Sequence, residues 1–180
     1  MGPLTKDIMT SALNALNIKI GERLNKKITL IMGGGGAMIL AHRFPLGTTD
    51  IDAIPKAGIT HDELDPMVKE IAVALSLPPD WLNPYFSNFV TNLPSDYQVR
   101  LISVFDEKFL QVQALGKEDM LIMKCFAHRK KDIGHARALF KLGANIDFVQ
   151  TQLEKLNHQK IPEAAAALKF LEEIIDLEEG

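Results

Sequence analysis

The chain has 180 residues, of which 47% are hydrophobic and 24% are charged, the balance of a globular domain rather than of a disordered protein. Its net charge of −3 gives no overall attraction for nucleic acid, so such binding would require a local basic patch. A single cysteine, Cys125, excludes an intramolecular disulfide. With a polar N-terminus and no apolar run of 18 residues, we expect a cytoplasmic protein with no membrane partner.

The first third of the chain predicts a helix, a strand and then a glycine turn. Apolar residues four apart predict an amphipathic helix over residues 4–24, and the apolar run that follows predicts a strand over 28–32. Four glycines, Gly33 to Gly36, come next, and a helix over 37–44 should end at Pro45. A second strand is predicted over 49–54.

The glycine turn is a candidate phosphate site. A strand that turns into a helix at glycines leaves backbone N–H groups uncovered, and such groups at a helix start favour an anion. The run lacks the G-K-[ST] of a P-loop, and the third glycine of a Rossmann fingerprint would fall on Met38, so both motifs are excluded. A simple tight turn is the alternative interpretation.

Two carboxylates, Asp50 and Asp52, occupy alternate positions of the second predicted strand. Residues i and i+2 of a strand share a face, so these side chains project together while Ile51 points the other way. A divalent cation would offset their repulsion, and Mg²⁺ is commonly held by one or two carboxylates together with substrate phosphate oxygens. The alternative is a solvated, inert pair on an exposed edge.

The middle and the end of the chain predict one more strand pair and a series of helices. A helix beginning at Thr60 or at Asp65 should run to residue 75, and Trp81 should anchor the Pro-rich loop that follows. The remaining predicted elements are a hairpin with strands 98–105 and 109–113, and helices over 117–129, 133–142, 147–156 with Asp147 as cap, and 162–178.

The glycine and carboxylate motifs together resemble the G-G-x-A…T-x-D-x-D signature of the polymerase-β-like nucleotidyltransferase superfamily. The residues that carry this resemblance are Gly34-Gly35-Gly36-Ala37-Met38 and Thr48-Thr49-Asp50-Ile51-Asp52. A later element is similar to the K-x-x-A-x-R-x-K-D pattern of the minimal, toxin-type branch, found in abortive-infection and type IV toxin–antitoxin systems. Its residues are Lys124, Ala127, Arg129, Lys131 and Asp132. The resemblance covers roughly residues 28–139.

The resemblance implies an α/β (α+β) fold in which helices flank a mixed sheet. Residues 1–115 would form the nucleotidyltransferase-like core, and residues 116–180 would form a helical portion packed on it, or the two would be a single domain. The implied activity is transfer of a nucleoside monophosphate from an NTP to a hydroxyl of RNA or protein. Mg²⁺ or Mn²⁺ would be held by Asp50 and Asp52. The implied nucleotide-binding residues are Gly34, Gly35, Gly36, Thr49, Lys124 and Arg129.

For Asp106, Asp132 and Lys124 both a functional and a structural interpretation are open. Superfamily members often carry a third carboxylate that helps to hold the metal, and Asp106 is the candidate, although it lies at a predicted turn where Asp is common. Asp132 either orients Lys124 or contacts a metal, or it caps the helix over 133–142. Lys124 either neutralises phosphate charge or snorkels at the rim of the core.

The chain also departs from the toxin-type pattern. The arginine usually found two residues before the T-x-D-x-D threonine is replaced by Leu46, with Arg43 the nearest arginine, and the acidic residue often found after the K-D pair is replaced by His135. Together with the two interpretations of Asp106, these changes keep open a degenerate fold that binds protein or nucleic acid. A metal-dependent nuclease that uses the same carboxylates is a second alternative. A cognate antitoxin is a further partner that the resemblance suggests.

Overall fold

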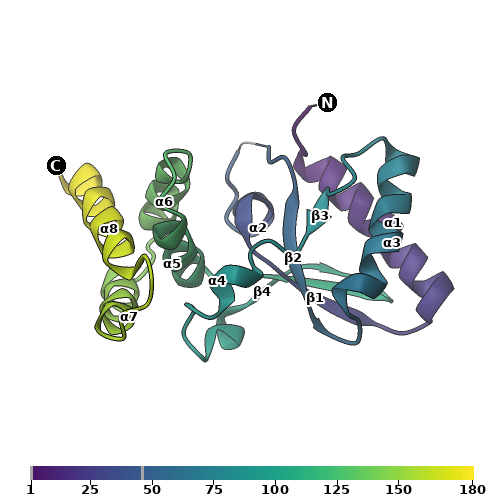
Figure 1. Ribbon diagram of the computed structural model, residues 1–180. Helices are drawn as coiled ribbons and strands as arrows, with labels where there is room; N and C mark the ends of the chain where they lie inside the picture. The colour runs from purple at the N-terminus through teal and green to yellow at the C-terminus, as the bar shows by residue number, and fades with distance from the viewer. Residues whose placement is uncertain (1, 46) are drawn as a thin grey trace. The chain divides into compact units, whose positions relative to one another are not determined.

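The computed structural model describes residues 2–45 and 47–180, which form two compact units (Figure 1). The sheet unit comprises Met1–Ser87 and Leu101–Leu115, and the helical unit comprises Asn88–Arg100 and Gly116–Gly180. Residues 88–100, which the sequence analysis counted with the core, therefore group with the C-terminal helices. Within the described ranges, no helix combines the length and the apolar character needed to cross a membrane.

The sheet unit is built on a mixed five-stranded sheet, which confirms the expected α/β class with a helical C-terminal part. Strand β1 pairs antiparallel with β2 and parallel with β5, and β4 completes the predicted hairpin with β5. The strand order is β3-β2-β1-β5-β4. The strands are β1 (Ile28–Met32), β2 (Ile51–Ala57), β3 (Leu82–Asn83), β4 (Ile102–Asp106) and β5 (Leu110–Ala114).

The two faces of this sheet differ in polarity because side chains alternate along each strand. One face carries the fully buried side chains Leu30, Ile51 and Val112. Helices α1 (Lys6–Leu24) and α3 (His61–Leu75), which lie side by side in Figure 1, supply further apolar side chains to the core. The opposite face carries polar residues of β1, β2 and β5, among them Asp52. The carboxylate pair therefore belongs to the polar face.

Strand β2 runs further than predicted and begins later. The sequence placed it over 49–54 and ended it at Pro55, whereas the structure has β2 over Ile51–Ala57. Pro55 is opposite Leu30, and the register of the β1–β2 pair shifts between Thr29 and Leu30. A proline, which cannot donate to a ladder, is tolerated at such an irregularity. The prediction that β2 stops at Pro55 was wrong for this reason.

The structure decides where two helices of the sheet unit begin and what the loop tryptophan does. The Thr60 hydroxyl accepts a hydrogen bond from the Glu63 N–H while the Glu63 carboxylate accepts one from the Thr60 N–H, so α3 begins at the capping box and not at Asp65. The loop anchor is confirmed: Trp81 is fully buried, and its indole N–H donates to the Val68 carbonyl at 2.9 Å. Helix α2 (Gly34–Leu40) starts inside the glycine run, earlier than the predicted residue 37.

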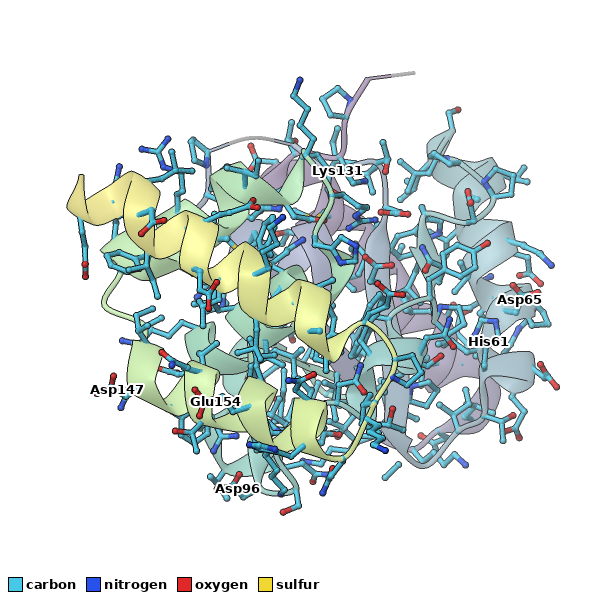
Figure 2. The ribbon with its side chains drawn as sticks, turned by 60° about the vertical axis from the view of Figure 1, so that its left-hand side comes forward. His61, Asp65, Asp96, Lys131, Asp147 and Glu154 are labelled. Atoms are coloured by element: carbon cyan, nitrogen blue, oxygen red, sulfur yellow. The ribbon has the colours of Figure 1, made fainter. Side chains whose placement is uncertain are left out.

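The helical unit is a cluster of packed helices. Its members are α5 (Lys117–Ala127), α6 (Asp132–Lys141), α7 (Ile146–His158) and α8 (Ala164–Glu179), preceded by the short α4 (Ser87–Val90) and the 3₁₀ turn η1 (Tyr97–Arg100). The predicted cap of α7 was wrong, because Asn145 accepts the Phe148 N–H. Asp147 instead lies exposed on the surface of α7 together with Glu154 (Figure 2).

An internal ion pair fastens η1 to the helices of this unit. The Arg100 guanidinium donates two hydrogen bonds of 2.9 Å to the fully buried Asp119 carboxylate on α5. The same guanidinium lies 4.8 Å from the centre of the Phe148 ring on α7. A bidentate pair stacked on an aromatic ring fixes the orientation of arginine well. Residues 97–100 are thereby held against α5 and α7.

Candidate functional site

The acidic pair lies where the chain enters β2. Ile51 is fully buried, so Asp50 and Asp52 on either side of it project toward the opposite, polar face, as expected. Asp50 lies just before the strand and Asp52 within it, and both are partly exposed. The two carboxylates thus share a face and remain accessible to solvent.

The glycine turn lies directly against Asp52. Gly34 has a φ of +60°, and a Cβ built on it would lie 1.9 Å from Oδ2 of Asp52. A Cβ is not accommodated at such a distance, so only glycine leaves room for this carboxylate. The Gly33 N–H also donates to the Asp52 carbonyl at 2.9 Å, which ties the turn to β2. The glycine turn and the acidic pair are therefore adjacent parts of one site within the sheet unit.

The turn also presents backbone donors. The first helical bond of α2 runs from the Ala37 N–H to the Gly33 carbonyl at 3.2 Å, so the three preceding N–H groups belong to the helix start, where no intrahelical acceptor is available. A Cβ on Gly35 would lie 2.4 Å from the Thr48 hydroxyl oxygen. Thr48 thus lies against the glycines, whereas Thr49, the predicted nucleotide-binding residue, contacts Asp50.

Thr49 and Asn83 contact Asp50. The Thr49 hydroxyl donates to Oδ1 of Asp50 at 3.3 Å, and the Asn83 amide donates to Oδ2 at 3.2 Å. Asn83 is only 4% exposed, and it lies on β3 opposite Asp52 in the β2–β3 register. The sequence analysis missed Asn83 because it treated residues 78–84 as a loop with a single anchor. An Asn-Pro pair signals a turn, but nothing local indicates that a two-residue strand pairs with β2.

The donor set of this site fits a hard divalent cation. Two carboxylates on one face supply oxygen ligands, and Mg²⁺ typically takes one or two carboxylates and completes its shell with water and substrate phosphate. In the part of the chain that the structure describes, no group of three or more His, Cys, Asp or Glu side chains is placed to hold a metal. The acidic pair would therefore supply only part of the metal's coordination shell, and water or substrate phosphate would complete it.

The expected third carboxylate, Asp106, does not lie with the pair. Across the sheet, Asp106 on β4 pairs with Gln111 on β5, and Gln111 pairs with Thr29 on β1. Thr29 in turn pairs with Ala57 on β2. Ala57 is five residues beyond Asp52 along β2, which corresponds to about 16 Å at the usual rise of a strand. Asp106 is consequently at the opposite end of the sheet from Asp52.

The side chain of Asp106 has a local role there. Its Oδ1 forms an exposed ion pair with the Lys27 ammonium at 2.5 Å, and this hydrogen bond lowers the pKa of the carboxyl group. The position on β5 nearest the acidic pair on the polar face is Gln113, which is level with Ile31 and whose amide oxygen accepts from Lys56 at 3.3 Å. The position on β5 nearest the acidic pair thus carries a neutral amide and not a carboxylate.

The later motif forms a charge cluster inside the helical unit, in which Lys124 and Asp132 are buried and Arg129 is exposed. The Lys124 ammonium, 3% exposed, lies 2.8 Å from Oδ1 of Asp132, and the Arg129 guanidinium donates to Oδ2 at 2.6 Å. Burial raises the pKa of Asp132, but hydrogen bonds from His135 and Arg129 and the charge of Lys124 outweigh it and hold the pKa well below its usual range. The capping interpretation of Asp132 was wrong, because Lys131 is the N-cap of α6.

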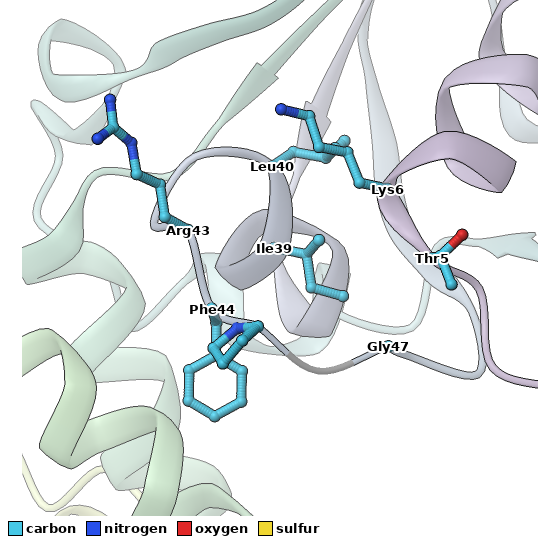
Figure 3. Close-up of a pocket in the computed structure, with 8 residues that line it drawn as sticks. Thr5, Lys6, Ile39, Leu40, Arg43, Phe44 and Gly47 are labelled. Atoms are coloured by element: carbon cyan, nitrogen blue, oxygen red, sulfur yellow. The ribbon is translucent and has the colours of Figure 1, made fainter.

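A cavity of about 500 Å³ borders the segment that leads to Asp50. Lys6, at the start of α1, and Arg43, just after α2, extend their charged ends to the same side of this segment (Figure 3). Ile39 and Leu40 contribute apolar lining. Leu46, which replaces the arginine of the toxin-type pattern, lies outside the described residues.

The mixed sheet thus places the D-x-D pair against the glycine turn. The chain belongs to the family of nucleotidyltransferases of unknown function (DUF6036), whose model matches residues 11–166. The matched range includes the glycine turn, the acidic pair and the Lys124–Asp132 cluster. No curated protein and no solved structure matches the chain.

Proposed function

We propose that this protein transfers a nucleoside monophosphate from an NTP to a hydroxyl group of RNA or protein, in a reaction that depends on Mg²⁺ or Mn²⁺. The observation that carries the proposal is the contact between the two halves of the site. Oδ2 of Asp52 occupies the space that a side chain on Gly34 would fill. Metal-binding oxygens and phosphate-binding N–H groups that adjoin one another suit a single metal-bound polyphosphate.

The roles follow from the position of each group. Asp50 and Asp52 would hold the cation, and the N–H groups of the glycine turn would bind the β- and γ-phosphates. When bound, the metal supplies positive charge that offsets the charge developing on the phosphoryl oxygens. The hydroxyl oxygen of the acceptor forms a bond to the α-phosphorus while the bond to the β-phosphate oxygen breaks. Pyrophosphate leaves with the bonding electron pair, and the hydroxyl proton passes to water.

The residues of the helical unit enter this proposal through the sequence resemblance. Lys124 and Arg129 are assigned to neutralising phosphate charge by the sequence resemblance, and each forms a close contact with Asp132. The toxin-type branch, a cytoplasmic location and an antitoxin partner also rest on that resemblance. Lys6 and Arg43 line the cavity in the sheet unit, and in this proposal their positive charge would attract an anionic acceptor.

The test uses the full chain with each of the four NTPs labelled at the α-phosphate, with total RNA or lysate protein as the acceptor. We expect label transfer that requires Mg²⁺ or Mn²⁺. Replacing Asp52 by Asn should lower the rate at least about 10²–10³-fold, the scale for removing one group that stabilises transition-state charge. Asp106→Asn, a change of the same chemistry on the same face at the other end of the sheet, should have a far smaller effect.

Three results would contradict the proposal. Wild-type rates in Asp52→Asn would show that the acidic pair does not act. Calorimetric titration that detects no metal-dependent binding of any NTP would favour a degenerate binding module. Breakdown of RNA or DNA in the absence of NTP, lost in the Asp52 variant, would identify a nuclease. If Asp106→Asn lost as much of the transfer rate as Asp52→Asn, Asp106 would also be required for the reaction.

A further inference from the structure

We infer that Asn83 is a positioning residue, which holds the Asp50 carboxylate in the orientation that binds the divalent cation. This inference rests on the assignment of Asp50 as a metal ligand in the proposed function. Asn83 itself does not contact the substrate; it acts through Asp50.

The amide orientation of Asn83 is fixed by a backbone group. Its Oδ1 accepts a hydrogen bond of 3.0 Å from the Tyr85 N–H, which can only donate. The opposite orientation of the amide would set its NH₂ group against that N–H and its oxygen against the Asp50 carboxylate. The NH₂ group therefore has to face Oδ2 of Asp50, at 3.2 Å.

The donor capacity of Asn83 is fully used. An amide NH₂ group carries two hydrogens, one of which is directed to Asp50 and the other to the Asp80 carbonyl at 3.4 Å. With the Tyr85 N–H bound to its oxygen, the Asn83 side chain is held at three points, and the residue itself is only 4% exposed. Hydrogen bonds shielded from water are stronger and fix a side chain more tightly than exposed ones.

The hydrogen bond from Asn83 engages one oxygen of the Asp50 carboxylate, and the other oxygen would face the cation. Oδ2 accepts a hydrogen bond from the buried Asn83 amide, whereas Oδ1 accepts one from the exposed Thr49 hydroxyl, at a long 3.3 Å. The strand register also places Asn83 next to Asp52. A partner that fixes one oxygen of a carboxylate orients the other toward a metal, and loss of such a partner typically weakens metal affinity 10–100-fold.

The test measures Mn²⁺ affinity of the full chain by the electron paramagnetic resonance signal of the free ion, without NTP. Asn83→Ala should weaken Mn²⁺ binding about 10–100-fold. Trp81→Phe is the matched control, because it loosens the same segment through the loss of the indole bond to Val68 but leaves the Asp50 contact in place. The control should lower thermal stability and leave Mn²⁺ affinity close to the wild-type value.

A second readout follows the metal in the transfer reaction. Asn83→Ala should raise the Mg²⁺ concentration needed for half the maximal rate by the same 10–100-fold factor and change the KM for NTP at saturating metal far less. A purely structural role would lower the amount of folded protein and leave this concentration unchanged.

Each outcome decides the matter. Wild-type Mn²⁺ affinity in Asn83→Ala, or an equal loss in Trp81→Phe, overturns the positioning role. A wild-type chain that does not bind Mn²⁺ overturns this inference together with the assignment of Asp50. If Mn²⁺ binds and the variant is weakened while no NMP transfer occurs, the proposed function fails and the role of Asn83 stands.

Discussion

The contact between Gly34 and Asp52 gives the sharpest prediction. Replacing Gly34 by Ala introduces two separate costs. The residue has a φ of +60°, and an L-residue in the left-handed region costs about 1–2 kcal/mol. The new Cβ would also lie 1.9 Å from Oδ2 of Asp52, where a separation of at least 3.0 Å is needed. The carboxylate must therefore retreat by about 1 Å or more, a misplacement that can cost about 10²-fold in rate.

A matched substitution separates the two costs. Gly58, in the same unit, also has a positive φ, of +87°, but a Cβ on it would find its nearest neighbour at an ordinary 3.6 Å. Gly58→Ala should therefore lose about 1–2 kcal/mol of unfolding free energy, like Gly34→Ala. Only Gly34→Ala should also lose about 10²-fold in transfer rate, together with Mn²⁺ affinity.

The assay combines urea unfolding followed by circular dichroism with Mn²⁺ binding and label transfer on the same protein preparations. The reasoning is refuted if Gly34→Ala keeps the wild-type rate and affinity, since the carboxylate would then not need its present position. It is equally refuted if Gly58→Ala loses as much activity, because strain of the backbone alone would then explain the effect.

Substitutions at three residues test the packing within the two units. Asp132→Ala removes the carboxylate 2.8 Å from the buried Lys124 ammonium and should cost about 3–5 kcal/mol in urea unfolding. The pKa of Asp132 is lowered on folding, so the ionised carboxylate stabilises the fold above the ordinary aspartate pKa of about 4, and this stabilisation is lost progressively as the pH falls below that value. The unfolding free energy of the wild type should therefore drop more between pH 7 and pH 3 than that of Asp132→Asn. Equal drops would contradict this. Trp81→Phe leaves the Val68 carbonyl without the indole donor and should cost at least about 2 kcal/mol by urea unfolding, and an unchanged midpoint would remove its role as anchor. Thr60→Ala should lower the thermal midpoint through a loss of about 1 kcal/mol, and no change would show that the capping box contributes nothing.

The comparison of sequence and structure shows which features are local. The apolar run of β1 and the buried Trp81 depend on residues close together in the chain, and both were predicted correctly. The capping box at Thr60 is also local, but the sequence left the start of α3 open between Thr60 and Asp65. The glycine turn and the acidic pair could also be singled out, because glycine freedom and strand alternation are short-range properties. What they indicated together was a candidate site for a metal and a phosphate.

The remaining features depend on how strands are paired. Asp106 looked suitable as a third carboxylate until the register of β4 placed it at the far end of the sheet. Asn83 looked like part of a loop until the pairing of β3 with β2 brought its amide to Asp50. Pro55 looked like the end of a strand until a register shift in β1 accommodated it. Each outcome required knowledge of a partner strand distant in the sequence.

The amino-acid sequence by itself determined the chemistry available to this protein: a flexible glycine run, two carboxylates that share a face, and the helix caps and apolar stripes that make the elements. Tertiary structure decided which of these groups meet, because strand register is set by backbone hydrogen bonds between segments far apart in the chain. The same pairing put the Asp52 carboxylate against the Cα of Gly34 and enclosed the Asn83 amide beside Asp50.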